Sequence, residues 1–317
     1  MMAGDVIGVR IGLSAVVIAL RNRQACVLTT AGEDGAPALP FGPFDPARDR
    51  TFELALRAFV TAQTGFRLGF VEQLYTFGDA GRESPRATPG PDRAREVSVG
   101  YLALTPDALD APQAEARWTP VLDIFPWEDH RKGRPAVLER LTTRLQAWCA
   151  TDARRRERVE SLFATGAGAR WDEGRVLDRY ELLYDAGLVH EAARDRAGRE
   201  ATPDAQTPQG LAMASDHRRI LATGLGRLRS KLKYRPVLFD LMPATFTLSG
   251  LQGAAEAIAG IALHKQNFRR GVERTGLVEA TGLLSTGTGG RPAELFRFTG
   301  AAPRDGQAPG LPLPVLR

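Results

Sequence analysis

A chain of 317 residues has room for two domains. Its 43% hydrophobic and 25% charged residues are typical of a soluble globular protein, which excludes a disordered or fibrous chain. No run of about 18 apolar residues is present, and the apolar segment 11–20 has no signal-peptide cleavage site after it. We therefore expect a cytoplasmic protein without membrane contact, in which Cys26 and Cys149 are reduced core residues.

The net charge of +5 is unevenly distributed along the chain. Residues 215–300 hold 13 Arg and Lys against 6 Asp and Glu, a local excess of +7, so the rest of the chain sums to −2. A basic C-terminal third on a near-neutral body predicts a polyanionic partner for that third. The alternative is an arginine-rich composition inherited from a GC-rich genome.

In chain order, the N-terminal part predicts two strands, a helix and two further strands. Their ranges are 9–20, 25–29, 51–64, 67–77 and 97–105. The helix has apolar residues at helical spacing, with Thr51 as a plausible N-cap and Gly65 as a plausible residue just beyond its end. This order is that of a Nudix-like α/β/α sandwich.

The segment 39–65 has the frame of a Nudix box without its catalytic acids. Leu39, Pro40, Phe41 and Gly42 match the start of the box, and Thr64 and Gly65 match its end. Counted back from Gly65, the positions of the box Arg and Glu residues hold Ala58, Phe59, Ala62 and Gln63. Mg²⁺ needs hard oxygen ligands, chiefly carboxylates. The remaining acid of this helix, Glu53, is interpreted as surface charge, so we expect no catalytic residue, no metal and no cofactor.

The middle of the chain predicts helices at 136–150, 153–163 and 175–188, which form a helical insertion at about 120–210. The apolar residues of the third helix are expected in the core. They are Tyr180, Leu182, Leu183 and Leu188. A polar loop or linker is expected at 195–209.

A long amphipathic helix is predicted at 217–234. Its apolar stripe can pack on the body or on a second subunit; the residues are Ile220, Leu221, Leu225, Leu228 and Leu232. Its arginines are expected to be solvated or to face DNA, and these are Arg218, Arg219, Arg227 and Arg229.

The C-terminal part predicts a winged helix-turn-helix. Ser249 and Gln252 have the spacing of a capping box for a helix that ends at Gly260, and a second helix, 264–274, ends before Gly276. A strand at 277–280, a glycine-rich turn at 287–290 and a strand at 293–298 complete the motif.

The helix 264–274 has the composition of a DNA recognition helix, with Phe268 and Val272 anchoring one face. Arg reads guanine, Asn and Gln read adenine, and cations contact phosphate. The predicted DNA-binding residues are Thr247, Ser249, His264, Lys265, Gln266, Asn267, Arg269, Arg270, Arg274 and Arg291. A solvated cationic surface is the alternative for the helix. Arg291, at the wing tip, either enters a minor groove or pairs with Glu279 or Glu294.

These stretches resemble the Nudix-related transcriptional regulators of bacterial NAD metabolism, of the NrtR type, and in particular their longer alphaproteobacterial relatives of the NadQ type. The similarity covers about two thirds of the chain, from both ends. The matching stretches are EQLYTFGD at 72–79, VSVGYLAL at 97–104, DHRRILATGLGRLRSKLKY at 216–234, FTLSGLQ at 246–252, NFRR at 267–270 and GRPAELFRF at 290–298. The helical insertion departs from the shorter regulators. The resemblance implies a homodimeric repressor of NAD biosynthesis or salvage genes that binds double-stranded operator DNA and senses NAD, ATP or ADP-ribose.

A nucleotide pocket needs an aromatic residue for the base and cations or amides for the diphosphate. The candidates are Arg10, Phe41, Arg57, Gln73, Tyr75 and Phe77. Tyr75 and Phe77 alternate with Leu74 and Thr76, so one pair is expected to face the pocket and the other the core. Core packing remains open for Phe77, a solvated position for both arginines, and a loop contact for Gln73.

The sequence thus predicts α/β plus winged helix architecture, with a Nudix-like sensing domain at 1–235, a winged helix-turn-helix at 236–300 and a disordered tail at 301–317. The expected function is transcriptional repression controlled by a nucleotide. Two alternatives are a Nudix hydrolase with displaced ligands, from Glu72 or Glu83, and a winged-helix adaptor without DNA specificity. The operator, the effector's identity and the sign of its effect are left open.

Overall fold

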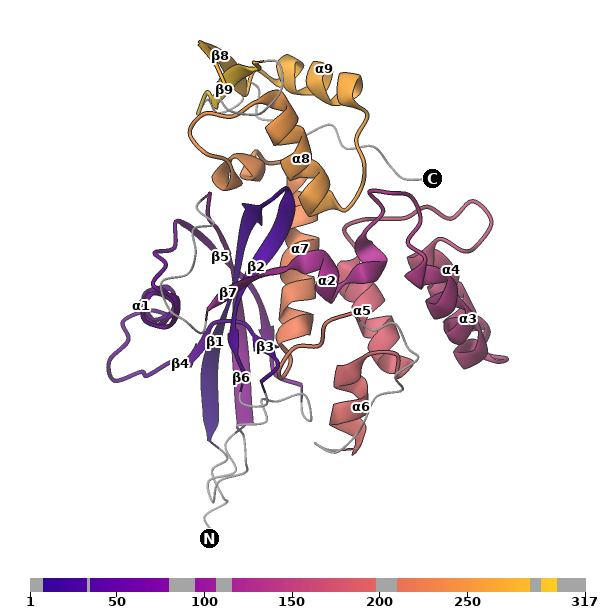
Figure 1. Ribbon diagram of the computed structural model, residues 1–317. Helices are drawn as coiled ribbons and strands as arrows, with labels where there is room; N and C mark the ends of the chain where they lie inside the picture. Colours follow the sequence, from indigo (N-terminus) through magenta and orange to yellow (C-terminus); the bar gives the residue numbers. More distant parts are fainter. Residues whose placement is uncertain are drawn as a thin grey trace.

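The computed structural model describes residues 8–32, 35–79, 95–106, 116–197, 210–285 and 292–300. A mixed β-sheet and a group of helices form the body of the protein, and a small helical unit with a two-stranded ribbon lies at one end of it (Figure 1). The predicted turn at 287–290, the predicted tail, Glu83 and Arg291 lie outside the described residues.

The sheet is built around β1 (Val9–Arg21), whose interior is buried on both faces. β1 pairs in parallel with β6 (Arg95–Leu104) and antiparallel with β2 (Gln24–Ala31), while β5 (Phe70–Phe77) is antiparallel to β6. The short strands are β3 (Pro37–Ala38), β4 (Phe41–Pro43) and β7 (Arg117–Pro120). The four predicted strands are therefore confirmed, and the short strands were not predicted.

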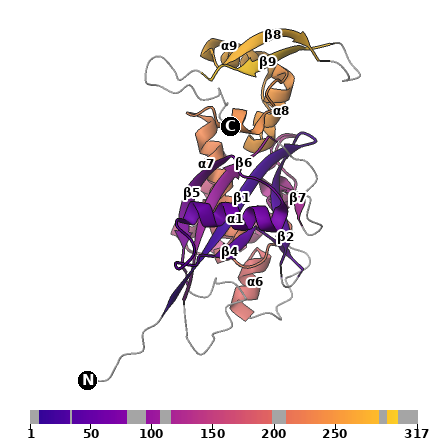
Figure 2. The same ribbon diagram turned by 90° about the vertical axis from the view of Figure 1, so that its left-hand side faces the viewer.

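One helix covers each face of this sheet. α1 (Phe52–Thr64) crosses one face (Figure 2), where its Leu56 and Val60 pack with Leu13 and Val17 of β1. The even-numbered residues of β1 face the other way and pack with α7 (His217–Leu232). The helical ends of α1 are as predicted, because the Thr51 hydroxyl accepts from the Leu54 N–H and Gly65 adopts a left-handed φ of 74°. The Nudix-like α/β/α sandwich is confirmed.

The described residues between β7 and α7 are mostly helical, and one of their helices, α5, packs beside α7 (Figure 1). Its helices are α2 (Val121–Ile124), the 3₁₀ turn η1 (Pro126–Glu128), α3 (Val137–Cys149), α4 (Ala153–Phe163), α5 (Val176–Asp185) and α6 (His190–Ala197). The three predicted helices are confirmed, including the burial of Tyr180 and Leu183. α6 was not predicted, and it extends into the stretch expected to be a loop. Both cysteines are buried and free.

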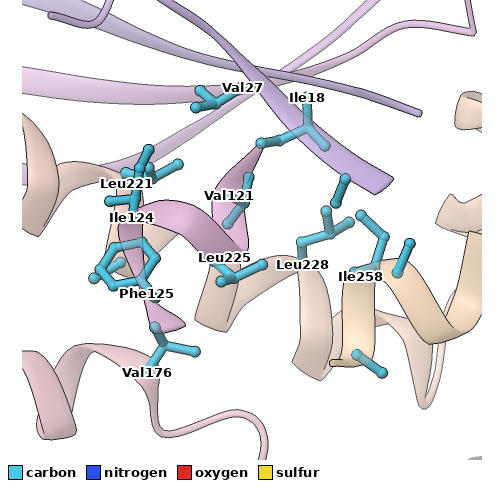
Figure 3. Close-up of a cluster of buried hydrophobic side chains, with 14 of the residues drawn as sticks. Ile18, Val27, Val121, Ile124, Phe125, Val176, Leu221, Leu225, Leu228 and Ile258 are labelled. Carbon is cyan, nitrogen blue, oxygen red and sulfur yellow. The ribbon is translucent and has the colours of Figure 1, made fainter. Parts of the chain in front are cut away.

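The apolar stripe of α7 is buried within the same chain, against the body and against the C-terminal unit. Ile220, Leu221, Leu225, Leu228 and Leu232 are each at most 1% exposed. Figure 3 shows three of them between sheet residues, such as Ile18 and Val27, and residues of α2 and α5. The alternative of a second subunit on this stripe is therefore wrong.

The arginines of α7 differ from the expectation that they are solvated. Arg218 and Arg229 are 0% exposed, and the side chain of Arg219 is 15% exposed; only Arg227 among these four is exposed. Arg218 pairs with Glu191 at 3.2 Å, and Arg229 pairs with Glu128 at 2.6 Å. The expectation was wrong because carboxylates from distant segments compensate these charges, a pairing that helical periodicity cannot reveal. Part of the C-terminal charge excess is therefore neutralised inside the protein.

The C-terminal unit has the order of a winged helix. Its elements are η2 (Val237–Leu241), α8 (Leu248–Ala259), α9 (Lys265–Thr275), β8 (Val278–Leu284) and β9 (Glu294–Phe298). Gly260 and Gly276 end the two helices with left-handed φ values of 71° and 67°, as expected. A bridge between Phe246 and Phe296 ties the segment before α8 to the ribbon. Ile258 of α8 belongs to the same hydrophobic core as Ile18 of the sheet (Figure 3).

The capping box predicted for α8 is wrong in position. The N-cap is Thr247, whose hydroxyl accepts from the Gly250 N–H at 3.0 Å. Gln252 instead donates to the carboxylate of Glu256 and to the backbone carbonyl of Leu263. Thr247 and Ser249, two residues apart, are both residue types favoured at an N-cap, and the sequence pattern alone did not separate them. No described helix is long and apolar enough to span a bilayer.

Candidate functional site

The solvent-facing side of α9 carries most of the predicted DNA-binding residues. His264, Lys265, Gln266, Asn267, Arg270 and Arg274 are all exposed. Phe268 and Val272 hold the opposite side in the core, at 2% and 0% exposure. The i, i+4 spacing of these two anchors therefore fixes which side chains point outward. The helix presents a cationic and amide surface that can donate to phosphate and to base edges.

Arg269 is the exception on this helix. It is only partly exposed, and its Nη2 donates to the hydroxyl of Ser249 in α8 at 3.2 Å. Its Nε is buried and has no hydrogen-bond partner among the described residues. Arg269 thus links the two helices of the motif, whereas Arg270 has its guanidinium in solvent.

The other predicted DNA-binding residues differ in how they are placed. Thr247 uses its hydroxyl oxygen as the cap of α8, and Ser249, two residues later, is exposed. The alternative partner named for Arg291, Glu279, forms an ion pair with Arg297 across the β8–β9 ribbon. This pair compensates the charge of Arg297 within the ribbon.

In the body, a small pocket lies between the start of the Nudix box segment, the sheet and the first turn of α7. Its lining residues are Ser14, Phe41, Phe77, Gly78, Asp79, Glu96, Ser98, Ser215, Asp216, His217 and Ile220. Its volume of about 30 Å³ corresponds to a single water molecule. Only one hydroxyl or amino group of a ligand can enter without movement of the surrounding segments. Two carboxylates of its wall, Asp79 and Asp216, pair with Arg219, and the hydroxyls of Ser14 and Ser98 bond to each other at 2.9 Å.

Phe41 and Phe77 are the two predicted ligand residues that meet at this pocket. Tyr75 lies beside them, with its ring centroid 5.5 Å from that of Phe77, but it is 62% exposed. The expected alternation along β5 is wrong: Leu74 and Phe77 are the buried residues, at 8% and 3% exposure. A register shift between Gln73 and Thr76 breaks the two-residue period.

The remaining predicted ligand residues lie away from this pocket. Arg57 donates to the Glu53 carboxylate and to the backbone carbonyls of Leu68 and Gly69, so it holds the segment after α1. Gln73 accepts from the Tyr101 hydroxyl at 3.4 Å. Arg10 is exposed near the start of β1. Arg57 therefore lies neither at this pocket nor in the solvated position that was the alternative.

His217 was missed in the sequence, although it connects this pocket to α7. Its Nδ1 accepts from the Leu39 N–H at 3.0 Å, and its ring lies 5.8 Å from that of Phe41. His217 is separated from Leu39 by 178 residues, so no local signal announces the contact. The start of the Nudix box segment is therefore tied to the helix that leads to the winged helix.

The positions of the box acids have acquired structural contacts. The Gln63 amide accepts from the Phe41 N–H at 3.2 Å and donates to the Phe41 carbonyl at 2.7 Å, which a carboxylate could not do. The Phe59 ring lies so close to Gly42 that a Cβ there would be 3.0 Å from it. No group of three His, Cys, Asp or Glu suited to a metal is found among the described residues. Glu72, a suggested displaced ligand, forms an ion pair with Lys231.

A buried ionic cluster joins the helical insertion, α7 and the winged helix. Glu128 accepts from Arg179 at 2.7 Å and from Arg229 at 2.6 Å, and all three side chains are 0% exposed. Burial alone would raise the pKa of Glu128, but the two arginines hold that pKa below its usual value. The guanidinium of Arg179 also stacks on Trp171, 3.8 Å from the ring centroid.

Comparison with known proteins identifies the C-terminal unit. Residues 238–298 match the NrtR DNA-binding winged helix domain family. The ADPR responsive transcriptional repressor NtrR of Acinetobacter baylyi is 42% identical over 88 residues, which cover 28% of this chain and 35% of that relative. The chain thus spans about a third of the length of this curated relative.

Similarity to solved structures extends over nearly the whole chain. One such structure is that of Shewanella oneidensis NrtR complexed with a 27mer DNA. Its alignment covers 91% of this chain and 93% of the Shewanella chain, with a TM-score of 0.54 and 21% sequence identity. A MutT/nudix family protein from Enterococcus faecalis covers 92% and 89%, with a TM-score of 0.51 and 16% identity. At these identities the likeness concerns the fold. The chain therefore combines a Nudix-like α/β body with a C-terminal winged helix domain of the NrtR type.

Proposed function

We propose that this protein is a transcriptional repressor that binds operator DNA through α9 and responds to an adenine nucleotide bound by its Nudix-like body. The observation that carries the proposal is the exposed cationic face of α9 within a segment that matches the NrtR DNA-binding winged helix domains. The whole-chain fold shared with a regulator crystallised on DNA supports it.

We propose ADP-ribose as the first effector to test, because the matching Acinetobacter relative is named as ADPR responsive. The replacement of the box acids by Phe59 and Gln63, each with a structural contact, supports sensing rather than hydrolysis. NAD and ATP remain the alternative effectors, and genes of NAD biosynthesis are the proposed targets.

A homodimer is part of the proposal, because a winged-helix regulator reads two half-sites about one DNA turn, roughly 34 Å, apart. Since the apolar stripe of α7 is buried within one chain, the dimer must use another surface. Sedimentation with a duplex that holds one or two half-sites measures the stoichiometry directly.

The experiment that tests the function is binding of the full chain to the DNA upstream of its own gene and of NAD-biosynthesis genes, by fluorescence anisotropy. Arg270→Ala should weaken selective binding by about 1–3 kcal/mol if the side chain reads a base edge. Arg227→Ala, an exposed arginine on α7, is the matched control and should change little. Equal affinity of the wild type for these duplexes and for unrelated DNA would contradict sequence-specific repression.

A further inference from the structure

A groove of about 470 Å³ separates the tip of the β1–β2 hairpin from the winged helix. Its lining residues are Leu20, Arg23, Pro106, Leu241, Met242, Pro243, Thr247, Ser249, Gly250, Gly253, Ala254, Ser285 and Ala293. The body and the winged helix both contribute to this wall. The groove is continuous with the proposed DNA-binding surface through Ser249, which accepts from Arg269 of α9.

Arg23 is the one cation among these lining residues, and it belongs to the body. Asn22 and Arg23 form the turn of the hairpin with left-handed φ values of 49° and 62°. The guanidinium of Arg23 lies against the backbone of α8 at Gly253, where a Cβ would be 3.4 Å from its Nε. Arg23 is exposed, and no carboxylate of the described residues pairs with it. Within the part of the chain that the structure describes, its charge is therefore uncompensated.

Hydroxyl groups complete the groove. The Ser249 oxygen accepts from Arg269 at 3.2 Å, so its own proton remains free to donate, and the adjacent guanidinium makes it a better donor. Thr247 and Ser285 add two more hydroxyls, and none of the described lining residues is acidic. A guanidinium with several neutral donors is the usual environment of a phosphodiester in a protein–DNA complex.

We propose that this groove receives a backbone phosphate of the operator DNA, and that Arg23 is its charged partner. This inference rests on the proposed function and deepens it, because it makes the nucleotide-sensing body itself a part of the DNA interface. Bound DNA then contacts the hairpin and α9 at once, and any shift of the hairpin relative to α8 changes operator affinity.

The test is the salt dependence of DNA binding by the full chain carrying Arg23→Asn. Asparagine tolerates the left-handed backbone of this turn, so the change removes the charge without straining the hairpin. One phosphate contact contributes about 0.9 to the slope of log K against log salt, so with one Arg23 from each protomer of the proposed dimer the slope should fall by about 1.8. From 50 to 200 mM salt the variant should lose about 12-fold less affinity than the wild type. An unrelated duplex should show the same change.

Two further variants make the result specific. Arg48→Asn removes the same charge from an arginine whose side chain is 87% exposed on the loop before α1, and it should leave the slope unchanged. Arg23→Lys keeps the charge and should keep the slope. If Arg23→Asn and Arg48→Asn show the same salt slope while the wild type still prefers its operator, the assignment of Arg23 is overturned but the proposed function is not. If the wild type instead binds the operator and an unrelated duplex with equal affinity, the proposed function itself is overturned.

Discussion

The Nε of Arg229 in α7 donates to the backbone carbonyl of Ile258 in α8 at 2.8 Å, in a position with no solvent access. The same guanidinium donates to Glu128 at 2.6 Å and to the backbone carbonyl of Glu173 at 3.1 Å. In the same region, the backbone N–H of His130 donates to the backbone carbonyl of Gly260 at 2.6 Å. The last turn of α8 is thus bonded to the body through both a charged side chain and the backbone.

These bonds hold the winged helix tightly against the body, whereas a flexible linker would let the two parts move independently. Gly260 packs so closely on Glu128 that a Cβ would lie 2.3 Å from the Glu128 carbonyl oxygen, which leaves no room for another residue. The shared apolar core around Ile18 and Ile258 adds to this contact. We infer that the winged helix moves only together with α7 and η1.

The first prediction concerns the stability contributed by Glu128. Glu128→Gln should lower the free energy of unfolding by about 3–5 kcal/mol, because it leaves two buried guanidinium groups without a counter-charge. Asp185→Asn is the matched control, since its ion pair with Arg158 leaves the two side chains 48% and 46% exposed, and it should cost about 0–1 kcal/mol. Urea unfolding measures both. Equal, small effects would show that the buried cluster contributes no more than a surface pair.

The sequence predicted most of the fold because each of its main elements has a local signal. Helical spacing marked α1, α7 and α9, and glycines marked the ends of α8 and α9. The buried cluster gave no such signal, since Glu128 and Arg229 are 101 residues apart. Sequence alone predicts that an arginine on a polar helix face is solvated, because the position of its carboxylate partner is known only in the folded chain.

The sequence predicted the residues of α9 better than those of the pocket, because only the former depend on local spacing. The outward residues of α9 follow from the positions of Phe268 and Val272, which are local. The pocket residues come from several segments, and the irregularity in β5 put Tyr75 and Phe77 in different environments. His217 and Arg23 act through contacts with Leu39 and Gly253, which only the folded chain brings near.

A second prediction concerns His130, whose ring packs against that of Trp171 at a centroid distance of 4.2 Å and an interplanar angle of 45°. Burial lowers the pKa of His130 from 6.5 to about 4. The unfolded chain therefore takes up a proton first as the pH falls, and stability present above pH 6.5 is lost progressively down to about pH 4. After allowance for partial solvent screening, the loss is about 1–2 kcal/mol.

Urea unfolding between pH 7.5 and 4 tests this prediction by comparing the wild type with His130→Phe, which keeps an aromatic ring on Trp171 but cannot titrate. Burial also lowers the pKa of His190, so both proteins should lose some stability on acidification. The wild type should lose more. Parallel pH profiles of the two proteins would mean that His130 is protonated equally in the folded and unfolded states.

A third prediction concerns Gln63, which stands where the Nudix box has a glutamate. Gln63→Glu removes the N–H that donates to the Phe41 carbonyl at 2.7 Å and places a carboxylate beside that oxygen. Because Gln63 is exposed, we expect a loss of only about 0.5–1.5 kcal/mol in the free energy of unfolding. No release of AMP from ADP-ribose with Mg²⁺ or Mn²⁺ is expected in the variant or the wild type. AMP production by the wild type that disappears in Glu53→Gln would revive the hydrolase alternative.

The last prediction concerns how a bound nucleotide reaches the DNA-binding surface. α7 contacts the start of the Nudix box segment through His217 at one end and α8 through Arg229 near the other. A nucleotide that displaces Phe41 or Leu39 therefore moves one rigid helix, and the winged helix follows it. A coupling free energy of about 1–3 kcal/mol would change operator affinity roughly 5- to 150-fold.

Arg229→Lys separates coupling from binding. Lysine keeps the charge beside Glu128 but cannot reproduce the fork of guanidinium donors that holds both Glu128 and Ile258. The variant should bind ADP-ribose with unchanged affinity, while the effect of ADP-ribose on operator affinity shrinks toward 1-fold. The same substitution at exposed Arg227 should leave that effect intact. Calorimetry for the nucleotide and anisotropy for the operator, at one fixed salt concentration, measure the two quantities separately. A full nucleotide response in Arg229→Lys would place the coupling outside this contact, because a contact that transmits the change cannot be weakened without reducing it.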